Sequence, residues 1–122
     1  MKKIVFLTLP IFLALYAGEG WVRTYGTENT DVATCVQQTS DGGYIAVGYR
    51  DLYYGPGYSH IWLLKTDSNG DTSWTRIYGK GFIIKEGYTK ANWVEQTLDG
   101  GYVIVASTRS FGDSWSIWLL KT

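Results

Sequence analysis

The chain has 122 residues, of which 16% are aromatic and 18% charged, and its basic and acidic residues are equal in number. This composition excludes a disordered tail, and the length suits one modest domain with a buried core. If Lys2 and Lys3 are removed with a leader, nine basic residues remain against eleven acidic ones. The small negative charge gives no reason to expect nucleic acid or an anionic membrane as a partner.

The first seventeen residues have the layout of a secretory signal peptide. Lys2 and Lys3 precede an apolar run from Ile4 to Ala17, as the basic and hydrophobic regions of such signals do. The run is shorter than the roughly 20 residues of a membrane-spanning helix, and Pro10 interrupts it. We therefore predict a signal peptide over 1–17 and a secreted, periplasmic or cell-surface protein, with a membrane anchor as the alternative.

The rest of the chain is predicted to form short strands separated by turns. Trp21 to Tyr25 alternates large side chains with Val and Thr, which is typical of a strand. Asp41-Gly42-Gly43 and Asp67 to Asp71 are dense in turn formers and predict hairpin connections. The further strands are expected at 32–39, 43–49, 60–66, 72–78, 90–97, 101–107 and 115–121. The single cysteine, Cys35, is expected to be a half-buried strand residue.

These elements form a tandem repeat, in which corresponding residues lie 53 to 58 positions apart. The matching segments are Trp21–Gly26 with Trp74–Gly79, Asp41–Val47 with Asp99–Val105, and Ile61–Thr66 with Ile117–Thr122. Four-stranded units repeated at roughly 40–50 residues are typical of β-propeller blades, and longer loops lengthen the period. The predicted fold is all-β, with two four-stranded antiparallel β-propeller blades in a repeat region over 18–122.

The motifs Asp-Gly-Gly-Tyr and Ile61-Trp62-Leu63-Leu64-Lys65-Thr66, followed by Asp67, Gly70, Asp71 and Trp74, resemble those of secreted bacterial β-propeller repeat proteins. A looser similarity is to quinoprotein-like propellers, in whose blades a Trp docks between neighbouring sheets. The resemblance implies this structural role for Trp74 and Trp21, and an extracellular, often surface-associated protein. Nothing in the chain matches a quinone site, so no cofactor is expected.

The number of blades departs from the propeller pattern. The chain holds one isolated strand (21–25), one whole blade (31–79) and three strands of a second blade (90–122), whereas a propeller closes with about four to eight blades. We expect the N-terminal strand to supply the missing fourth strand of the second blade. Two explanations stay open: a fragment of a longer propeller, whose missing blades would be the partner, or a unit that builds a propeller by homo-oligomerisation.

Aromatic residues in the long connections are the candidate ligand-binding residues, because function concentrates on loops above a rigid scaffold. Exposed rings suit glycans or polypeptides as ligands, although such rings can also pack loops onto blades. The candidates are Tyr53, Tyr54, Tyr58, Phe82, Tyr88, Phe111 and Trp115.

No catalytic or metal site is predicted. Asp67 to Asp71 lacks the bidentate Glu of an EF-hand, and the lone His60 makes neither a triad nor a metal site. Glu86, Glu95 and Asp113 are the carboxylates that a glycosidase pair would draw on. Structural roles are expected for the turn residues Gly42, Gly43, Gly100 and Gly101, and for Gln38 and Gln96, as a hydrogen bond made once per blade.

The sequence therefore predicts a non-catalytic secreted β-propeller module for extracellular binding or surface structure. The alternative is a carbohydrate-active or carbohydrate-recognising protein that uses its aromatic loops.

Overall fold

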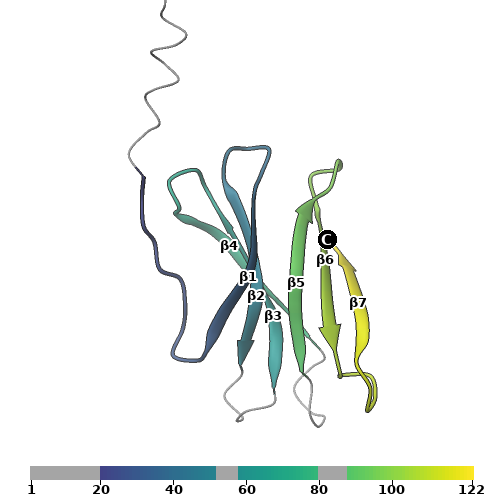
Figure 1. Cartoon of the computed structure of the whole chain (residues 1–122). Helices are drawn as coiled ribbons and strands as arrows, with labels where there is room; N and C mark the ends of the chain where they lie inside the picture. Colours follow the sequence, from purple (N-terminus) through teal and green to yellow (C-terminus); the bar gives the residue numbers. More distant parts are fainter. Residues whose placement is uncertain (1–19, 52–57, 80–87) are drawn as a thin grey trace, which may run out of the picture.

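The computed structural model describes residues 20–51, 58–79 and 88–122 as seven strands in two antiparallel sheets (Figure 1). The first sheet has the order β1-β2-β3-β4 and the second the order β5-β6-β7. The strands are β1 (Asp31–Gln38), β2 (Tyr44–Asp51), β3 (Ser59–Thr66), β4 (Thr72–Tyr78), β5 (Thr89–Gln96), β6 (Tyr102–Thr108) and β7 (Ser116–Lys121). Each lies within two residues of its predicted range. The all-β prediction is confirmed.

Glycines at positive φ close the hairpins between consecutive strands. Gly42, Gly70 and Gly100 have φ of 84°, 81° and 83°, a backbone region that residues with a Cβ rarely adopt. The three hairpins lie at one end of the sheets, and the strand ends that the longer connections join lie at the other end (Figure 1). The two ends are called here the hairpin end and the loop end.

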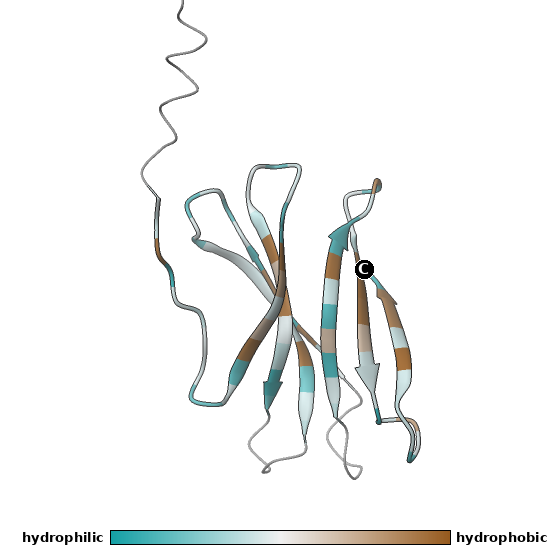
Figure 2. Cartoon of the chain, in the orientation of Figure 1, coloured by the Kyte–Doolittle hydropathy of each residue, from teal (hydrophilic) through white to brown (hydrophobic). Residues whose placement is uncertain are grey.

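The sheets stack face to face, and the core lies between them. Ile45, Val47, Ile61 and Leu63 of the first sheet cluster with Ala91, Val94, Tyr102, Ile104 and Ala106 of the second sheet, all nearly inaccessible to solvent. Because successive side chains of a strand point to opposite faces, β2 and β3 use every second residue for this core. β5 accordingly shows alternating hydrophobic and hydrophilic bands (Figure 2). Cys35 is half-buried against the same cluster, as predicted.

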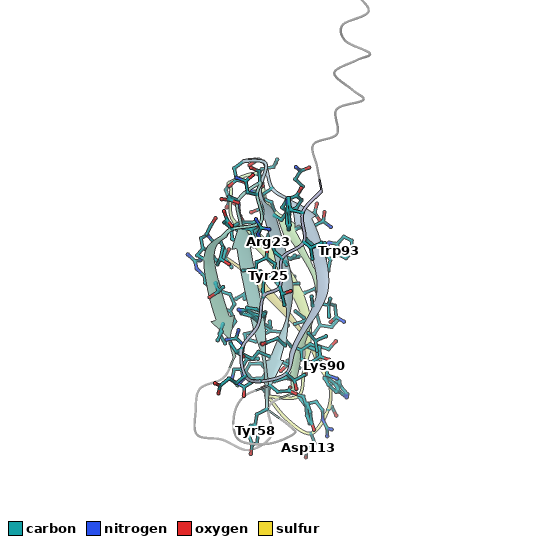
Figure 3. All side chains as sticks on the ribbon, turned by 90° about the vertical axis from the view of Figure 1, so that its left-hand side faces the viewer. Arg23, Tyr25, Tyr58, Lys90, Trp93 and Asp113 are labelled. Carbon is teal, nitrogen blue, oxygen red and sulfur yellow. The ribbon has the colours of Figure 1, made fainter. Side chains whose placement is uncertain are left out.

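The prediction of a strand at 21–25 is wrong, and no described residue adds a fourth strand to the second sheet. The segment Gly20–Tyr25 instead lies over the face of the first sheet that points away from the second (Figures 1 and 3). The Trp21 indole donates a hydrogen bond to the Ser68 carbonyl oxygen (3.1 Å), and the Tyr25 hydroxyl donates one to the Gly70 carbonyl oxygen (2.6 Å). Side-chain contacts therefore hold the segment, which makes no sheet ladder with the described strands.

The predicted signal peptide and its alternative, a membrane anchor, lie outside the described residues. Within the described ranges, no helix is long and apolar enough to cross a membrane.

Candidate functional site

The described aromatic candidates gather at the loop end. Tyr58 directly precedes β3, and Tyr88 forms a parallel bridge with Ser59. Phe111 and Trp115 are exposed in the connection between β6 and β7. Figure 3 shows Tyr58 at this end together with Asp113 of the β6–β7 connection. Arg23 and Tyr25 lie far from them, on the face of the first sheet. Tyr53, Tyr54 and Phe82 lie outside the described residues.

Aromatic contacts and a hydrogen bond hold the β6–β7 connection in place. The Phe111 ring packs edge-on against Trp118 of β7, with ring centroids 6.1 Å apart. The Arg109 guanidinium lies 5.9 Å from the centroid of the Trp115 ring and donates a hydrogen bond to the Asp113 carbonyl oxygen (3.0 Å). Phe111 thus partly serves packing, while Trp115 presents an exposed ring at the loop end.

A buried hydroxyl cluster beneath these loops joins the two sheets. The Ser59 hydroxyl of β3 donates to the Thr89 carbonyl oxygen and accepts from the Thr89 amide, both at 3.1 Å. The Thr89 hydroxyl lies 2.9 Å from that of Thr108 and 3.2 Å from that of Ser110. Each of these hydroxyls has a partner, so the cluster is a structural joint that fixes the loop end. Sequence reasoning missed it, because single Ser and Thr residues carry no distinguishing pattern.

An ion pair in the first sheet, between Asp31 and Arg50, takes the position that Thr89 and Thr108 have in the second sheet. Asp31 lies opposite Arg50 in the β1–β2 register, and the Arg50 Nε to Asp31 Oδ1 distance is 2.6 Å. Burial raises the pKa of the Asp31 carboxyl, but hydrogen bonds from Arg50 and Thr27 outweigh burial and leave the pKa below its ordinary value. The Arg50 guanidinium also stacks 4.3 Å above the Trp62 ring. The charge of the Arg50 guanidinium thus pairs with Asp31, and its planar face packs on Trp62.

At the hairpin end, each Asp-Gly-Gly turn forms the same hydrogen-bonded cap. Asp41 accepts hydrogen bonds from the Thr39 hydroxyl and the Gly43 amide, and its Oδ2 lies 2.9 Å from the Lys65 ammonium. The Thr39 bond, then Lys65 and the Gly43 amide, hold the pKa of the Asp41 carboxyl well below its usual range.

The second turn repeats this cap with Asp99, Thr97, Gly101 and Lys121. The pKa of Asp99 is likewise lowered well below its usual range, mainly by the Thr97 hydroxyl and then by Lys121. Both aspartates thus cap their turns. The lysine was missed, although its recurrence in Ile-Trp-Leu-Leu-Lys-Thr was the available signal.

The glutamines differ between the repeats. Gln96 Oε1 accepts a hydrogen bond from the Ser40 amide at 2.8 Å, which ties the second sheet to the first hairpin. Gln38, its counterpart, is exposed and makes no such bond to the described residues. Among the described residues, the expected bond is therefore seen for Gln96, at the junction between the two sheets.

A groove with a volume of about 740 Å³ lies between Gly20–Tyr25 and the outer face of the first sheet. Its lining is mostly apolar and comprises Gly20, Trp21, Tyr25, Asp31, Val32, Ala33, Val36, Tyr44, Ala46, Val47, Gly48, Trp62, Leu64 and Thr66. The Trp62 indole nitrogen is buried and has no hydrogen-bond partner among the described atoms. The groove was not predicted, because it depends on where the N-terminal segment docks.

The structure does not assemble the acidic residues into a site. Glu95 lies at the hairpin end of β5, whereas Asp113 lies in a loop-end connection, so the two cannot act as a carboxylate pair; Glu86 lies outside the described residues. The Asp67 carboxylate accepts from the Asn69 and Asp71 amides, as in an ordinary turn. Across the described ranges, no three His, Cys, Asp or Glu side chains are placed to hold a metal ion.

Comparison of the chain with protein-family models, curated proteins and solved structures found no match.

Proposed function

We propose that the protein is a non-catalytic secreted β-propeller module for extracellular binding or surface structure. The observation that supports this most is the repeated unit itself. The same turn cap and the same strand motif recur in two sheets that stack face to face. Such a stack is a rigid scaffold, and the strand ends that the long connections join lie at one end, where variable loops can bind a ligand.

Several polar groups of the described scaffold are engaged in structural contacts. Asp41 and Asp99 cap turns, Asp31 pairs with Arg50, and the Ser59 hydroxyl hydrogen-bonds the backbone of Thr89. A catalytic carboxylate or nucleophile needs a partner arrangement aimed at substrate. The contacts of the described side chains therefore favour a structural role over a catalytic one.

Carbohydrate recognition at the loop end is the second candidate, favoured by the exposed Trp115 ring. An indole offers a broad apolar face with few rotatable bonds, which suits the apolar face of a sugar ring. Under this hypothesis Tyr53, Tyr54, Tyr58 and Tyr88 would extend the same surface.

The test is a glycan-array screen of the mature protein, followed by titration of any hit. Trp115→Ala and the Tyr53→Ala/Tyr54→Ala double variant should each lower affinity at least tenfold if the loop end recognises sugar. Trp93→Ala, which removes an exposed indole away from the loops, is the matched control and should leave affinity unchanged. A hit that is insensitive to all loop variants contradicts this binding site, and absence of hits leaves the surface-structure role as the proposal to pursue.

A further inference from the structure

The two faces of the second sheet have very different surroundings. The face toward the first sheet is packed in the core. The other face exposes Ile117 at 83% and Leu119 at 68%, whereas their counterparts in the first sheet, Ile61 and Leu63, are fully buried. β3 and β7 have the same apolar sequence pattern, but a neighbouring sheet covers the Ile61 and Leu63 face of β3 and none of the described strands covers the Ile117 and Leu119 face of β7. β7 therefore presents a contact surface with no contact partner within the described chain.

The first sheet shows the complementary difference. Val94 of β5 is fully buried against the first sheet, whereas its counterpart Val36 of β1 is 62% exposed. Val36 lines the 740 Å³ groove together with Ala46 and Leu64, which are the counterparts of the core residue Ile104 and of Leu120, packed against the core. The outer face of the first sheet thus repeats the inner face of the second.

These two faces already fit each other inside the chain. The core pairs the β2–β3 face of the first sheet with the β5–β6 face of the second. The outer face of the second sheet has the apolar pattern of the β2–β3 face, and the outer face of the first sheet has the pattern of the β5–β6 face. The outer faces of two molecules can therefore pack in the same way as the two sheets pack within one chain. Because the paired patches differ, the contact is head-to-tail and can repeat.

The N-terminal segment supplies the strand that this contact needs. In the first sheet, β4 places Tyr78, Arg76 and Trp74 opposite Ile61, Leu63 and Lys65 of β3. Trp21, Arg23 and Tyr25 repeat Trp74, Arg76 and Tyr78. Trp21 packs edge-on on Tyr44 with centroids 5.7 Å apart, as Trp74 packs on Tyr102 at 5.9 Å. The segment is therefore already docked where a preceding sheet's fourth strand would lie.

We propose that a second copy of this chain is the partner: β7 of one molecule pairs antiparallel with Trp21–Tyr25 of the next, and its Ile117 and Leu119 fill the groove over the next molecule's first sheet. The inference rests on the proposed blade architecture and specifies how blades meet between chains. Its register places Ile117 opposite Tyr25, Leu119 opposite Arg23 and Lys121 opposite Trp21. With two sheets in the described part of each chain and about four to eight blades per propeller, rings of about two to four chains result.

One repeated hydrogen bond extends the argument. Gln96 accepts from the amide of Ser40 in the preceding hairpin. By the same correspondence, Gln38 of one molecule accepts from the amide of Leu98 in its neighbour, and Leu98 is fully exposed in the single chain. The contact would thus give both glutamines the same role, which the single chain gives to Gln96 alone.

Register-specific disulfide formation tests the proposal. Arg23→Cys and Leu119→Cys are combined in a Cys35→Ser background, because directly opposed strand residues come within the Cα separation that a disulfide requires, about 4.4–6.8 Å. The segment Gly20–Tyr25 and β7 lie on opposite sides of the two-sheet stack (Figure 1), so these two cysteines can link only between chains. Mild oxidation should give disulfide-linked multimers on non-reducing gels. Thr24→Cys with Leu119→Cys is the matched control, since Thr24 points to the other strand face and should not link.

Sedimentation of the unmodified mature chain supplies the second readout. We expect an assembled species in the micromolar range that Leu119→Arg converts to a folded monomer, while Ser114→Arg, at an exposed position in the β6–β7 connection, leaves the assembly intact. A chain that stays monomeric and does not cross-link overturns the proposal, as does cross-linking equal in both cysteine pairs. Neither readout involves the loop end, so a failed glycan screen leaves this result unchanged, and failed assembly leaves a glycan result unchanged.

Discussion

The indole of Trp74 meets the ring of Tyr102 edge-on, with centroids 5.9 Å apart and ring planes at 61°. Trp74 comes from β4 and Tyr102 from the first residue of β6, so this contact joins the two sheets. The same arrangement recurs between Trp21 and Tyr44, at 5.7 Å and 71°. The recurrence shows that the N-terminal segment uses the packing of a fourth strand, although it forms no strand ladder here.

Replacing Trp74 should destabilise the fold. Trp74→Ala removes a half-buried indole packed against the core, and we expect the free energy of unfolding to fall by about 2–3 kcal/mol, somewhat less than the roughly 3–5 kcal/mol of a fully buried Trp. Urea unfolding followed by circular dichroism measures this change. Trp115→Ala, at an exposed position, should change the free energy by less than about 0.5 kcal/mol. Equal losses from both variants would contradict the docking role.

Gly43 should tolerate no side chain. A Cβ at this position would lie 2.1 Å from the Thr66 carbonyl oxygen and 2.7 Å from Lys65 Nζ, so Gly43→Ala should displace the β3 end and break the Asp41 cap. We expect a loss of about 1–3 kcal/mol, as for other overpacked sites, seen as a lower Tm. Gly20→Ala, whose Cβ would meet nothing within 4 Å, is the control, and a Tm equal in both variants would count against the close approach.

Acid should weaken the turn caps. Hydrogen bonds from Thr39 and Lys65 lower the pKa of folded Asp41, so its stabilising effect is full above the unfolded pKa of about 4 and is lost as the pH falls through the folded pKa. The Tm should therefore drop on acidification below about pH 4. Asp41→Asn should flatten this part of the Tm-against-pH curve, whereas Asp113→Asn in the exposed β6–β7 connection should not. An unchanged slope in Asp41→Asn would refute the cap's contribution.

The two glutamines should behave differently. Gln96→Leu leaves the Ser40 amide without its acceptor and should lower the free energy of unfolding by about 1 kcal/mol. Gln38→Leu should leave the unfolding of dilute, monomeric protein unchanged, because Gln38 makes no such bond within the described chain. It should instead weaken the proposed assembly, measured by sedimentation against concentration. If the two variants lose the same free energy of unfolding at low concentration, the hydrogen bond between Gln96 and the Ser40 amide is not the cause of the loss.

The sequence by itself determined the strands, the turns and the repeat. Gly42 and Gly100 sit where hairpins need positive φ, and alternating apolar residues such as Ile45 and Val47 mark one face of a strand. These signals are local, because turn geometry and strand alternation involve neighbours in the chain. The contacts of Lys65 and Lys121 with the turn aspartates could also have been predicted, because both lysines recur at the same position of the repeat.

Only the tertiary structure decided which faces are covered. Ile61 and Ile117 have the same local sequence, yet one is fully buried and the other largely exposed, because burial depends on whether another sheet lies above the strand. The same holds for Trp21, whose repeat pattern predicted a strand but whose ring packs on Tyr44 from an unpaired segment. A strand ladder needs a partner edge, and within the described chain β7 lies at the opposite side of the stack.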